Sequence, residues 1–284
     1  MNSTPRSRSL SVRWFSMAAA FSLALGPAFR TASGRQSSAA VAQGKANVTA
    51  KGSAKIDLTG YWVSLIDEEW RWRMMTPPKG DFSFVPLNAE GRRVASLWDP
   101  AADDAAGNQC RAYGAAGIMR LPERLHVTWA DDNTLRIDID AGKQTRLLHF
   151  DGSKWNGGEP TWQGDSVASW QKQAQSGGFG TPNSNAAAPQ GGSLKVVTTH
   201  LRPGYLRKNG VPYSADSVLT EYFDRFDLDG ASYLTVTGIV EDPQYLTGRF
   251  ITTEQFKGEP DGSKWNPTPC YTAPPGRAPA HAGY

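Results

Sequence analysis

The stretch RLHVTWADDNTLRIDIDAGKQTRLLHF, residues 124–150, decides the fold class. Apolar residues fill every second position in 125–129 and again in 135–139, and Asp131-Asp132-Asn133 separates the two runs. A second turn, Ala141-Gly142-Lys143, leads into a third run. Period-two alternation is typical of strands with one buried face, and Asp, Asn and Gly favour tight turns. The stretch therefore predicts a three-stranded antiparallel meander.

The same alternation continues on both sides of this meander. It predicts further strands near 60–66, 69–74, 193–200, 218–226, 233–240 and 250–256. One short helix is expected at 88–98, with Asn88 as its cap and Asp99-Pro100 at its end. About nine short strands and one helix predict a single all-β, mainly antiparallel domain over residues 55–270, either a closed barrel or a closed sandwich.

The beginning of the chain has the layout of a secretory signal. Arg6, Arg8 and Arg13 precede an apolar run at 14–25, and Gly26-Pro27 follows it. We expect residues 1–42 to be a signal peptide and leader, which places the protein in the periplasm or outside the cell, without a stable membrane span after processing.

Composition predicts three further segments without fixed structure. These are a disordered linker at 43–54, a Gly- and Ser-rich flexible insertion at 177–192 and a disordered tail at 271–284.

The folded part is slightly acidic. Residues 1–54 hold seven of the 30 Lys and Arg residues and no Asp or Glu, which leaves 23 basic against 27 acidic residues for the remainder. No run of basic residues interleaved with aromatics suggests a nucleic-acid surface, so we exclude nucleic acid as a partner. The only two cysteines, Cys110 and Cys270, are expected to form a disulfide in an oxidising compartment.

Two parts of the sequence are similar to known groups of proteins. The segment DLTGYW at 57–62 resembles the Gly-x-Trp opening strand of lipocalin-like, calycin-type barrels, and the resemblance implies that Trp62 plugs the closed end of the barrel. Residues 161–166 (TWQGDS), Trp170 and 193–204 (SLKVVTTHLRPG) resemble a group of uncharacterised exported bacterial proteins with a Trp-x-Gly-x-Ser … Val-x-Thr-x-His-x-x-Pro-Gly-Tyr pattern. This second resemblance implies a fold and a compartment but no reaction.

Familiar catalytic and metal motifs do not explain the chain. Gly164-Asp165-Ser166 is similar to the nucleophile motif of some esterases, but the only late histidine that could serve as base is His281. The four histidines do not have the spacing of a zinc site, so we expect neither a metal nor a cofactor.

Polar residues on otherwise apolar strands are the remaining candidates. His126, His200 and Glu221 are candidate catalytic residues if they face the interior, whereas a solvated outer face would leave them without a role. The segment 200–214 offers Arg202, Tyr205 and Arg207 either as ligand contacts at a barrel mouth or as a cross-barrel brace whose arginines pair with Glu221, Asp224 or Asp242. The aromatic residues Trp72, Trp129 and Trp162 are candidate ligand contacts or ordinary core.

Two functions are compatible with these features. The first is an exported binding protein that holds a small, partly apolar or aromatic ligand in a calyx. The alternative is a cofactor-free acid/base enzyme of the isomerase, lyase or hydratase type that uses His, Glu and Arg residues at the barrel mouth. The sequence leaves the oligomeric state open.

Overall fold

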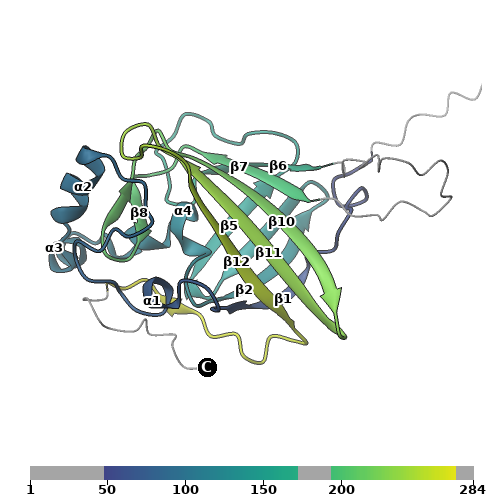
Figure 1. The fold of residues 1–284 in the computed structure, drawn as a ribbon. Coiled ribbons are helices and arrows are strands. Elements are labelled where there is room, and N and C mark those ends of the chain that lie inside the picture. Colours follow the sequence, from purple (N-terminus) through teal and green to yellow (C-terminus); the bar gives the residue numbers. More distant parts are fainter. Residues whose placement is uncertain (1–47, 172–192, 273–284) are drawn as a thin grey trace, which may run out of the picture. The chain divides into compact units, whose positions relative to one another are not determined.

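The computed structural model describes residues 48–171 and 193–272, and within them nine strands close into a barrel (Figure 1). Around the barrel the order is β1 (Gly60–Leu65), β12 (Phe250–Glu259), β11 (Ala231–Glu241), β10 (Val218–Leu228), β7 (Leu194–Thr199), β6 (Asp165–Trp170), β5 (Gln144–His149), β3 (Thr134–Ile139) and β2 (Arg124–Asp131). Neighbours pair antiparallel except β5 and β6, which are parallel. Of the two expected architectures, the structure has the closed, mainly antiparallel barrel, and β2, β3 and β5 are the predicted meander. The expectations for residues 1–42, 43–47, 177–192 and 273–284 concern parts outside the described residues.

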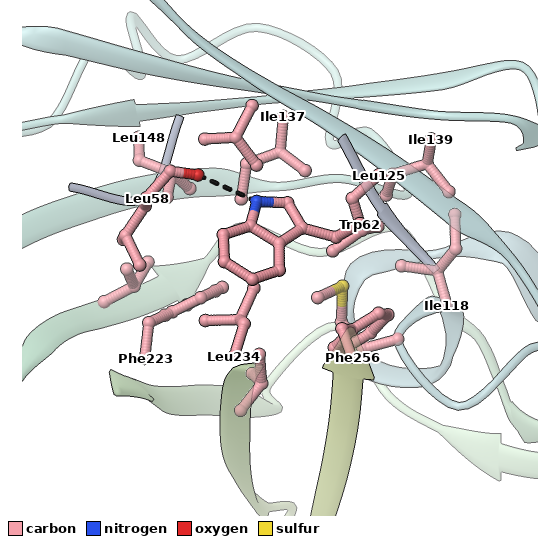
Figure 2. Packing of buried hydrophobic residues seen from close by; sticks show 14 of the residues in the cluster. Leu58, Trp62, Ile118, Leu125, Ile137, Ile139, Leu148, Phe223, Leu234 and Phe256 are labelled. Carbon is pink, nitrogen blue, oxygen red and sulfur yellow. Dashed lines mark hydrogen bonds between the residues drawn. The ribbon is translucent and has the colours of Figure 1, made fainter. Parts of the chain in front are cut away.

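The barrel core is built around Trp62 of β1 (Figure 2). This indole is buried among aliphatic and aromatic side chains from the surrounding strands, including Leu125, Ile137, Leu234 and Phe256. Its Nε1 donates a hydrogen bond to the Leu58 carbonyl oxygen at 2.9 Å, so the one polar atom of the ring is satisfied. One end of the barrel is therefore filled by side chains.

The other end carries a cap of short elements. It contains α1 (Trp70–Arg73), α2 (Ala89–Ser96), α3 (Pro100–Ala105), the 3-10 helix η1 (Gln109–Tyr113), α4 (Ala115–Ile118) and the hairpin of β8 (Gly204–Arg207) and β9 (Val211–Tyr213). A second buried cluster joins Ala95 of α2 and Leu206 of β8 to barrel residues Leu219, Val240 and Phe250. Figure 1 shows α2, α3 and β8 gathered beside this end. Across residues 48–171 and 193–272, no helix has both the length and the apolar character needed to cross a bilayer.

Three local expectations were wrong. The strand expected at 69–74 is the helix α1, entered through a left-handed Glu69 with φ of 50°. The described ranges contain four short α-helices rather than one. The expected helix does form as α2, with the Asn88 side chain accepting from Gly91 N, but Asp99 caps a new helix, α3, by accepting from Ala101 N and Ala102 N.

The end of the expected linker is also ordered. Ala50 N donates to Asn133 Oδ1 and Lys51 N donates to the Asp132 carbonyl oxygen, each at 3.0 Å. Trp170 Nε1 in turn donates to the Ala50 carbonyl oxygen at 2.9 Å. Residues 49–54 therefore form a turn held against the β2–β3 hairpin, since that hairpin offers side-chain and backbone partners that composition does not predict.

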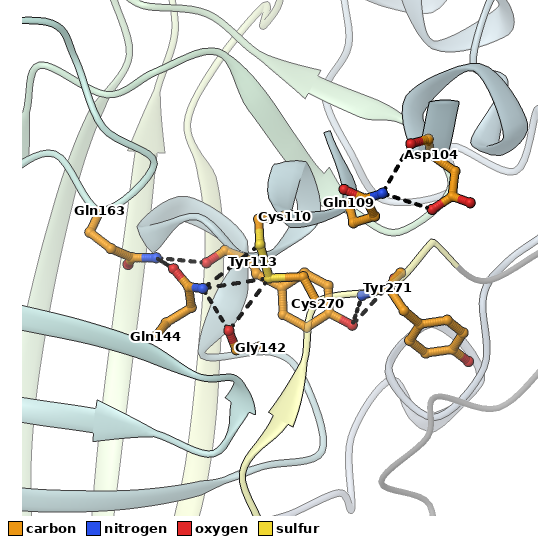
Figure 3. Close-up of a disulfide and its surroundings, with 9 residues drawn as sticks. All are labelled: Asp104, Gln109, Cys110, Tyr113, Gly142, Gln144, Gln163, Cys270 and Tyr271. Carbon is orange, nitrogen blue, oxygen red and sulfur yellow. Dashed lines mark hydrogen bonds between the residues drawn. A yellow bond between two sulfur atoms is a disulfide. The ribbon is translucent and has the colours of Figure 1, made fainter. Parts of the chain in front are cut away.

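A disulfide between Cys110 in η1 and Cys270 confirms the predicted pairing, with the two Cα atoms 5.1 Å apart (Figure 3). Beside it, the short strand β13 (Thr268–Pro269) pairs in parallel with β4 (Ala141–Gly142). Gln144 Nε2 donates to the Gly142 carbonyl oxygen at 2.7 Å, next to both sulfur atoms. The bond thus ties the last described residues to the cap and to the β3–β5 connection.

Candidate functional site

The interior changes character along the barrel axis. Inward positions near Trp62 are apolar, whereas charged side chains collect where the barrel meets the cap. On β12, for example, Glu254 occupies the same inward phase as Phe250 and Phe256. The buried charged residues of this region are Arg73, Arg120, Glu123, Arg146, Arg207, Lys208, Glu221 and Glu254. Buried charges are costly unless they are paired or used on a ligand, so this cluster marks the part of the barrel to examine for function.

One part of the cluster is a closed ion pair. Arg146 Nη1 donates to Glu221 Oε1 at 2.8 Å, and its Nη2 donates to Glu221 Oε2. The Glu221 carboxylate holds the pKa of Arg146 above its ordinary value in spite of the opposing effect of burial. A hydrogen bond between the Ser166 and Thr198 hydroxyl groups, 2.8 Å long, lies beside this pair. Arg146 and Glu221 are therefore joined by two parallel bonds, while Arg146 Nε has no hydrogen-bond partner within the described residues.

A pocket of about 220 Å³ opens between the start of α1 and β12. It is lined by Glu68, Glu69, Arg73, Arg120, Ile251, Thr252, Thr253 and Glu254. Three elements build it: α1 brings Arg73, the turn after α4 brings Arg120, and the alternation of β12 turns Glu254 inward. The pocket is thus lined mainly by charged and hydroxyl side chains.

Arg73 is the residue of this pocket with unused hydrogen-bonding capacity. Its side chain is almost fully buried, with 2% exposure, and its Nε donates to the Arg120 carbonyl oxygen at 3.0 Å. Its Nη2 has no hydrogen-bond partner within the described part of the chain. Burial lowers the pKa of Arg73, although the guanidinium remains a cation at neutral pH. The Nη2 group of Arg73 is therefore a buried, cationic hydrogen-bond donor that is suited to bind an anion.

Arg120 is shared between two carboxylates. Its Nη1 lies 3.4 Å from Glu254 Oε1, and its Nη2 contacts Glu69. Arg207 reaches the same Glu69 at 3.9 Å. Arg120 and Arg207 thus share Glu69, and the pocket brings several arginines and carboxylates together.

Glu254 can change its protonation near neutral pH. Burial raises its pKa to about 7, although Arg120 and Arg73 oppose this shift. The Thr252 hydroxyl donates to Glu254 Oε2 at 3.2 Å. When Glu254 is ionised it can pair with Arg120. When Glu254 is protonated and neutral, Arg120 is available to another anion.

The candidate catalytic residues do not form one site. His126 stacks on Tyr61 with ring centroids 4.1 Å apart on the outer face of the barrel. His200 stacks on Trp155 at 3.9 Å, after the end of β7. Glu221 is the one of the three that points inward, and Arg146 occupies both of its oxygens. Each of the three residues thus has its own partners.

The segment 200–214 is neither a surface loop nor the expected brace. It forms the buried hairpin β8–β9, in which the Tyr205 hydroxyl donates to Asp103 Oδ2 at 2.7 Å and Arg207 Nη1 donates to the Ser83 carbonyl oxygen at 2.8 Å. Arg202 is exposed and lies over the Trp162 ring at 4.3 Å. The hairpin is buried because the cap elements cover it. Ser214 donates from N and Oγ to Asp242, but among the described residues neither Arg202 nor Arg207 pairs with Glu221, Asp224 or Asp242.

The candidate aromatic residues lie in three separate places. Trp72 of α1 packs under Arg207 and donates from Nε1 to Asp81 at 3.0 Å, close to the charged pocket. Trp129 packs against Phe150 in the barrel core, and Trp162 lies beneath Arg202. Arg207 and Trp72 are therefore the predicted ligand contacts that come nearest to the pocket.

Sequence reasoning missed Arg73, Arg120 and Glu254. The signal for Glu254 was present, because an acidic residue stands in the apolar phase of the strand between Phe250 and Phe256. Arg73 and Arg120 carry no such signal, since their burial depends on how the cap folds over the barrel.

Among residues 48–171 and 193–272, no group of three or more His, Cys, Asp or Glu side chains is arranged to hold a metal ion. The fold and the pocket together define a closed β-barrel with a charged mouth. Comparison with protein-family models, curated proteins and solved structures found no match to this chain.

Proposed function

We propose that this chain is an exported binding protein that holds a small molecule by a carboxylate or a similar anionic group at the capped end of the barrel. The observation that carries the proposal is the unpartnered Nη2 of Arg73, buried beside Arg120 in the 220 Å³ pocket. A guanidinium in such a place can form charge-assisted hydrogen bonds to a carboxylate. Export is supported by the signal-like segment 1–42 together with the disulfide.

The lining of the pocket favours a more polar ligand than the sequence suggested. Ile251 contributes apolar surface, but charged and hydroxyl groups make up most of the wall. The volume suits a compact acid of a few heavy atoms, because one water molecule occupies about 30 Å³ in the liquid.

Calorimetric titration with a panel of small mono- and dicarboxylates tests this proposal. The wild type is expected to bind at least one acid, and Arg73→Gln is expected to weaken that binding about tenfold or more, since a charged hydrogen bond contributes about 1.5–3 kcal/mol. Arg71→Gln is the matched control, because Arg71 lies on the same short helix but is 65% exposed. Equal affinity in wild type and Arg73→Gln, or binding by no acid in the panel, would contradict the proposal.

One observation favours a catalytic role for the same pocket. Burial raises the pKa of Glu254 to about 7, so ionised Glu254 can accept a proton from the carbon next to the carboxylate of a bound acid. Arg73 and Arg120 line the same pocket and can stabilise the negative charge that develops. This candidate function keeps acid/base chemistry but moves it from the histidines to Glu254. Incubation of the bound acid in D₂O tests it: catalysis predicts deuterium at the carbon next to the carboxylate, seen by NMR and lost in Glu254→Gln. Binding without exchange would leave the binding protein as the function.

A further inference from the structure

Gly238 leaves a gap in the inward face of β11. The other inward positions along this part of the strand carry buried apolar side chains, those of Leu234, Val236 and Val240. A glycine in the interior of a strand weakens it, because glycine loses more conformational freedom on folding and packs no side chain. Such glycines mark a bulge, a bend, or a place where a ligand or another backbone comes close.

The strand itself does not explain Gly238. The residue is not among the glycines with positive φ, and it pairs in regular register with Glu221 of β10 and Thr252 of β12. A Cβ atom added to Gly238 would meet Thr252 Oγ1 at 3.6 Å and Leu219 Cδ1 at 3.9 Å, which are ordinary van der Waals distances. Neither a bulge nor a close backbone therefore requires glycine here, and the explanation that is left is the approach of a ligand.

The gap belongs to a small space of about 20 Å³ between α4 and the strands β10, β11 and β12. Apolar side chains make up most of its wall, among them Ala116 of α4, Leu219 of β10 and Val236 of β11. A space of this size holds about one water-sized group. Because the wall is mainly apolar, the group that suits it is a methyl group.

This space adjoins the anion pocket, since Arg120, Thr252 and Glu254 line both. Arg120 Nη1 and Glu254 Oε1 are 3.4 Å apart, which is longer than an ordinary N–H···O hydrogen bond. A bound molecule can displace this contact by moving two long side chains, without a change in the barrel strands. The pocket and the space at Gly238 can thus hold the two ends of one ligand.

We propose that the pocket selects short, unbranched aliphatic monocarboxylates, with the carboxylate at Arg73 and Arg120 and the terminal methyl group beside Gly238. This inference rests on the proposed binding function and names the class of acid. Gly238 is then a residue that determines specificity, because the side chain it lacks leaves room for the methyl group. An acid that is too short gains nothing from this space, and a longer one exceeds it.

Calorimetric titration of the full chain with acetate, propionate, butyrate and valerate tests the inference. In the wild type the affinity should rise along the series, by about fourfold for each CH₂ group that becomes buried, up to one preferred acid. Gly238→Ala should weaken the binding of that acid by about fourfold or more, because the added methyl group occupies the space. The affinity for acetate should change by less than about twofold, since acetate has no chain to place there.

Gly258→Ala is the matched control. Gly258 also occupies an inward position, on β12, but it lies beside Trp62 and lines neither the anion pocket nor the space at Gly238. A Cβ atom at Gly258 would come no closer than 3.4 Å to Ser232, so alanine fits there as well. This variant should keep the wild-type preference among the four acids.

The outcomes separate this inference from the binding function on which it rests. If acids bind through Arg73 with no dependence on chain length, or if Gly238→Ala keeps the wild-type preference, the inference is overturned and the binding function stands. If no acid binds, or if Arg73→Gln leaves the affinity unchanged, both are overturned.

Discussion

Arg146 of β5 and Glu221 of β10 form a doubly hydrogen-bonded ion pair across the barrel interior, where their side chains are 0% and 2% exposed. The two strands are not neighbours, because β6 and β7 lie between them in the barrel order. The pair therefore links two strands that are not adjacent in the barrel wall.

Breaking this pair should destabilise the fold strongly. Glu221→Gln keeps the size of the side chain but leaves the Arg146 charge buried without its counterion, and we expect a loss of about 3–5 kcal/mol in the free energy of unfolding. Urea denaturation followed by Trp fluorescence measures it. The double variant Arg146→Met/Glu221→Leu should recover most of the loss, since it removes both charges.

The matched control is the exposed pair of Arg249 and Glu241, whose side chains are 65% and 49% exposed. Glu241→Gln should change the free energy of unfolding by less than about 0.5 kcal/mol, because solvent screens this pair. A similar cost for both single substitutions would show that the interior position of Glu221 does not matter.

Reduction of the disulfide should lower stability. Cys110 and Cys270 are separated by 160 positions, and closing so long a loop stabilises a folded chain by up to about 5 kcal/mol in the chain-entropy model. We expect a lower urea midpoint in a reducing agent and in Cys110→Ser/Cys270→Ser. The reducing agent should have no further effect on the double variant, and an unchanged midpoint in both cases would contradict the prediction.

Lys208 and Glu254 should make stability depend on pH in opposite directions. The pKa of Glu254 is raised from 4.5 to about 7, so the folded chain binds the extra proton and stability falls as pH rises from 4.5 to 7. The pKa of Lys208 is lowered from 10.5 to about 7, so the unfolded chain binds the extra proton and stability rises between pH 7 and 10.5. Each group contributes a slope of at most about 1.4 kcal/mol per pH unit.

Two variants separate these contributions. Glu254→Gln should gain stability over the wild type at pH 8 but not at pH 4.5, whereas Lys208→Met should gain most at pH 6 and progressively less towards pH 10. Urea unfolding at these pH values measures both differences. If the difference in the free energy of unfolding between variant and wild type stayed constant across pH, the assigned ionisations would be contradicted.

Binding of a carboxylate should weaken as pH rises through 7. Above this value the ionised Glu254 competes with the ligand for Arg120, 3.4 Å away. We expect the affinity of the wild type to fall about tenfold or less between pH 6 and pH 8, measured by calorimetry. Glu254→Gln should bind tightly at both values, and Glu68→Gln, at the rim of the same pocket, should keep the wild-type dependence.

The β strands and the disulfide were predictable from the sequence. The strand signal is local, and the cysteine pairing is unambiguous. Alternation in 124–150 specifies strands with one buried face, and two cysteines allow only one pairing within the chain. The helix α1 was not predictable, because Trp70 and Trp72 alternate with arginines as in a strand, yet the barrel closes without this segment.

The sequence by itself predicted a closed, mainly antiparallel β fold that could be a barrel or a sandwich, its meander, the α2 helix with its Asn88 cap and the disulfide. Only the tertiary structure decided which charges are buried together, because Arg73, Arg120 and Glu254 come from three segments far apart in the chain. Periodicity in the sequence predicts which face of a strand or helix is apolar, but not which other elements pack against that face. The unpartnered groups of Arg73 and Lys208 lie where the cap covers the barrel mouth.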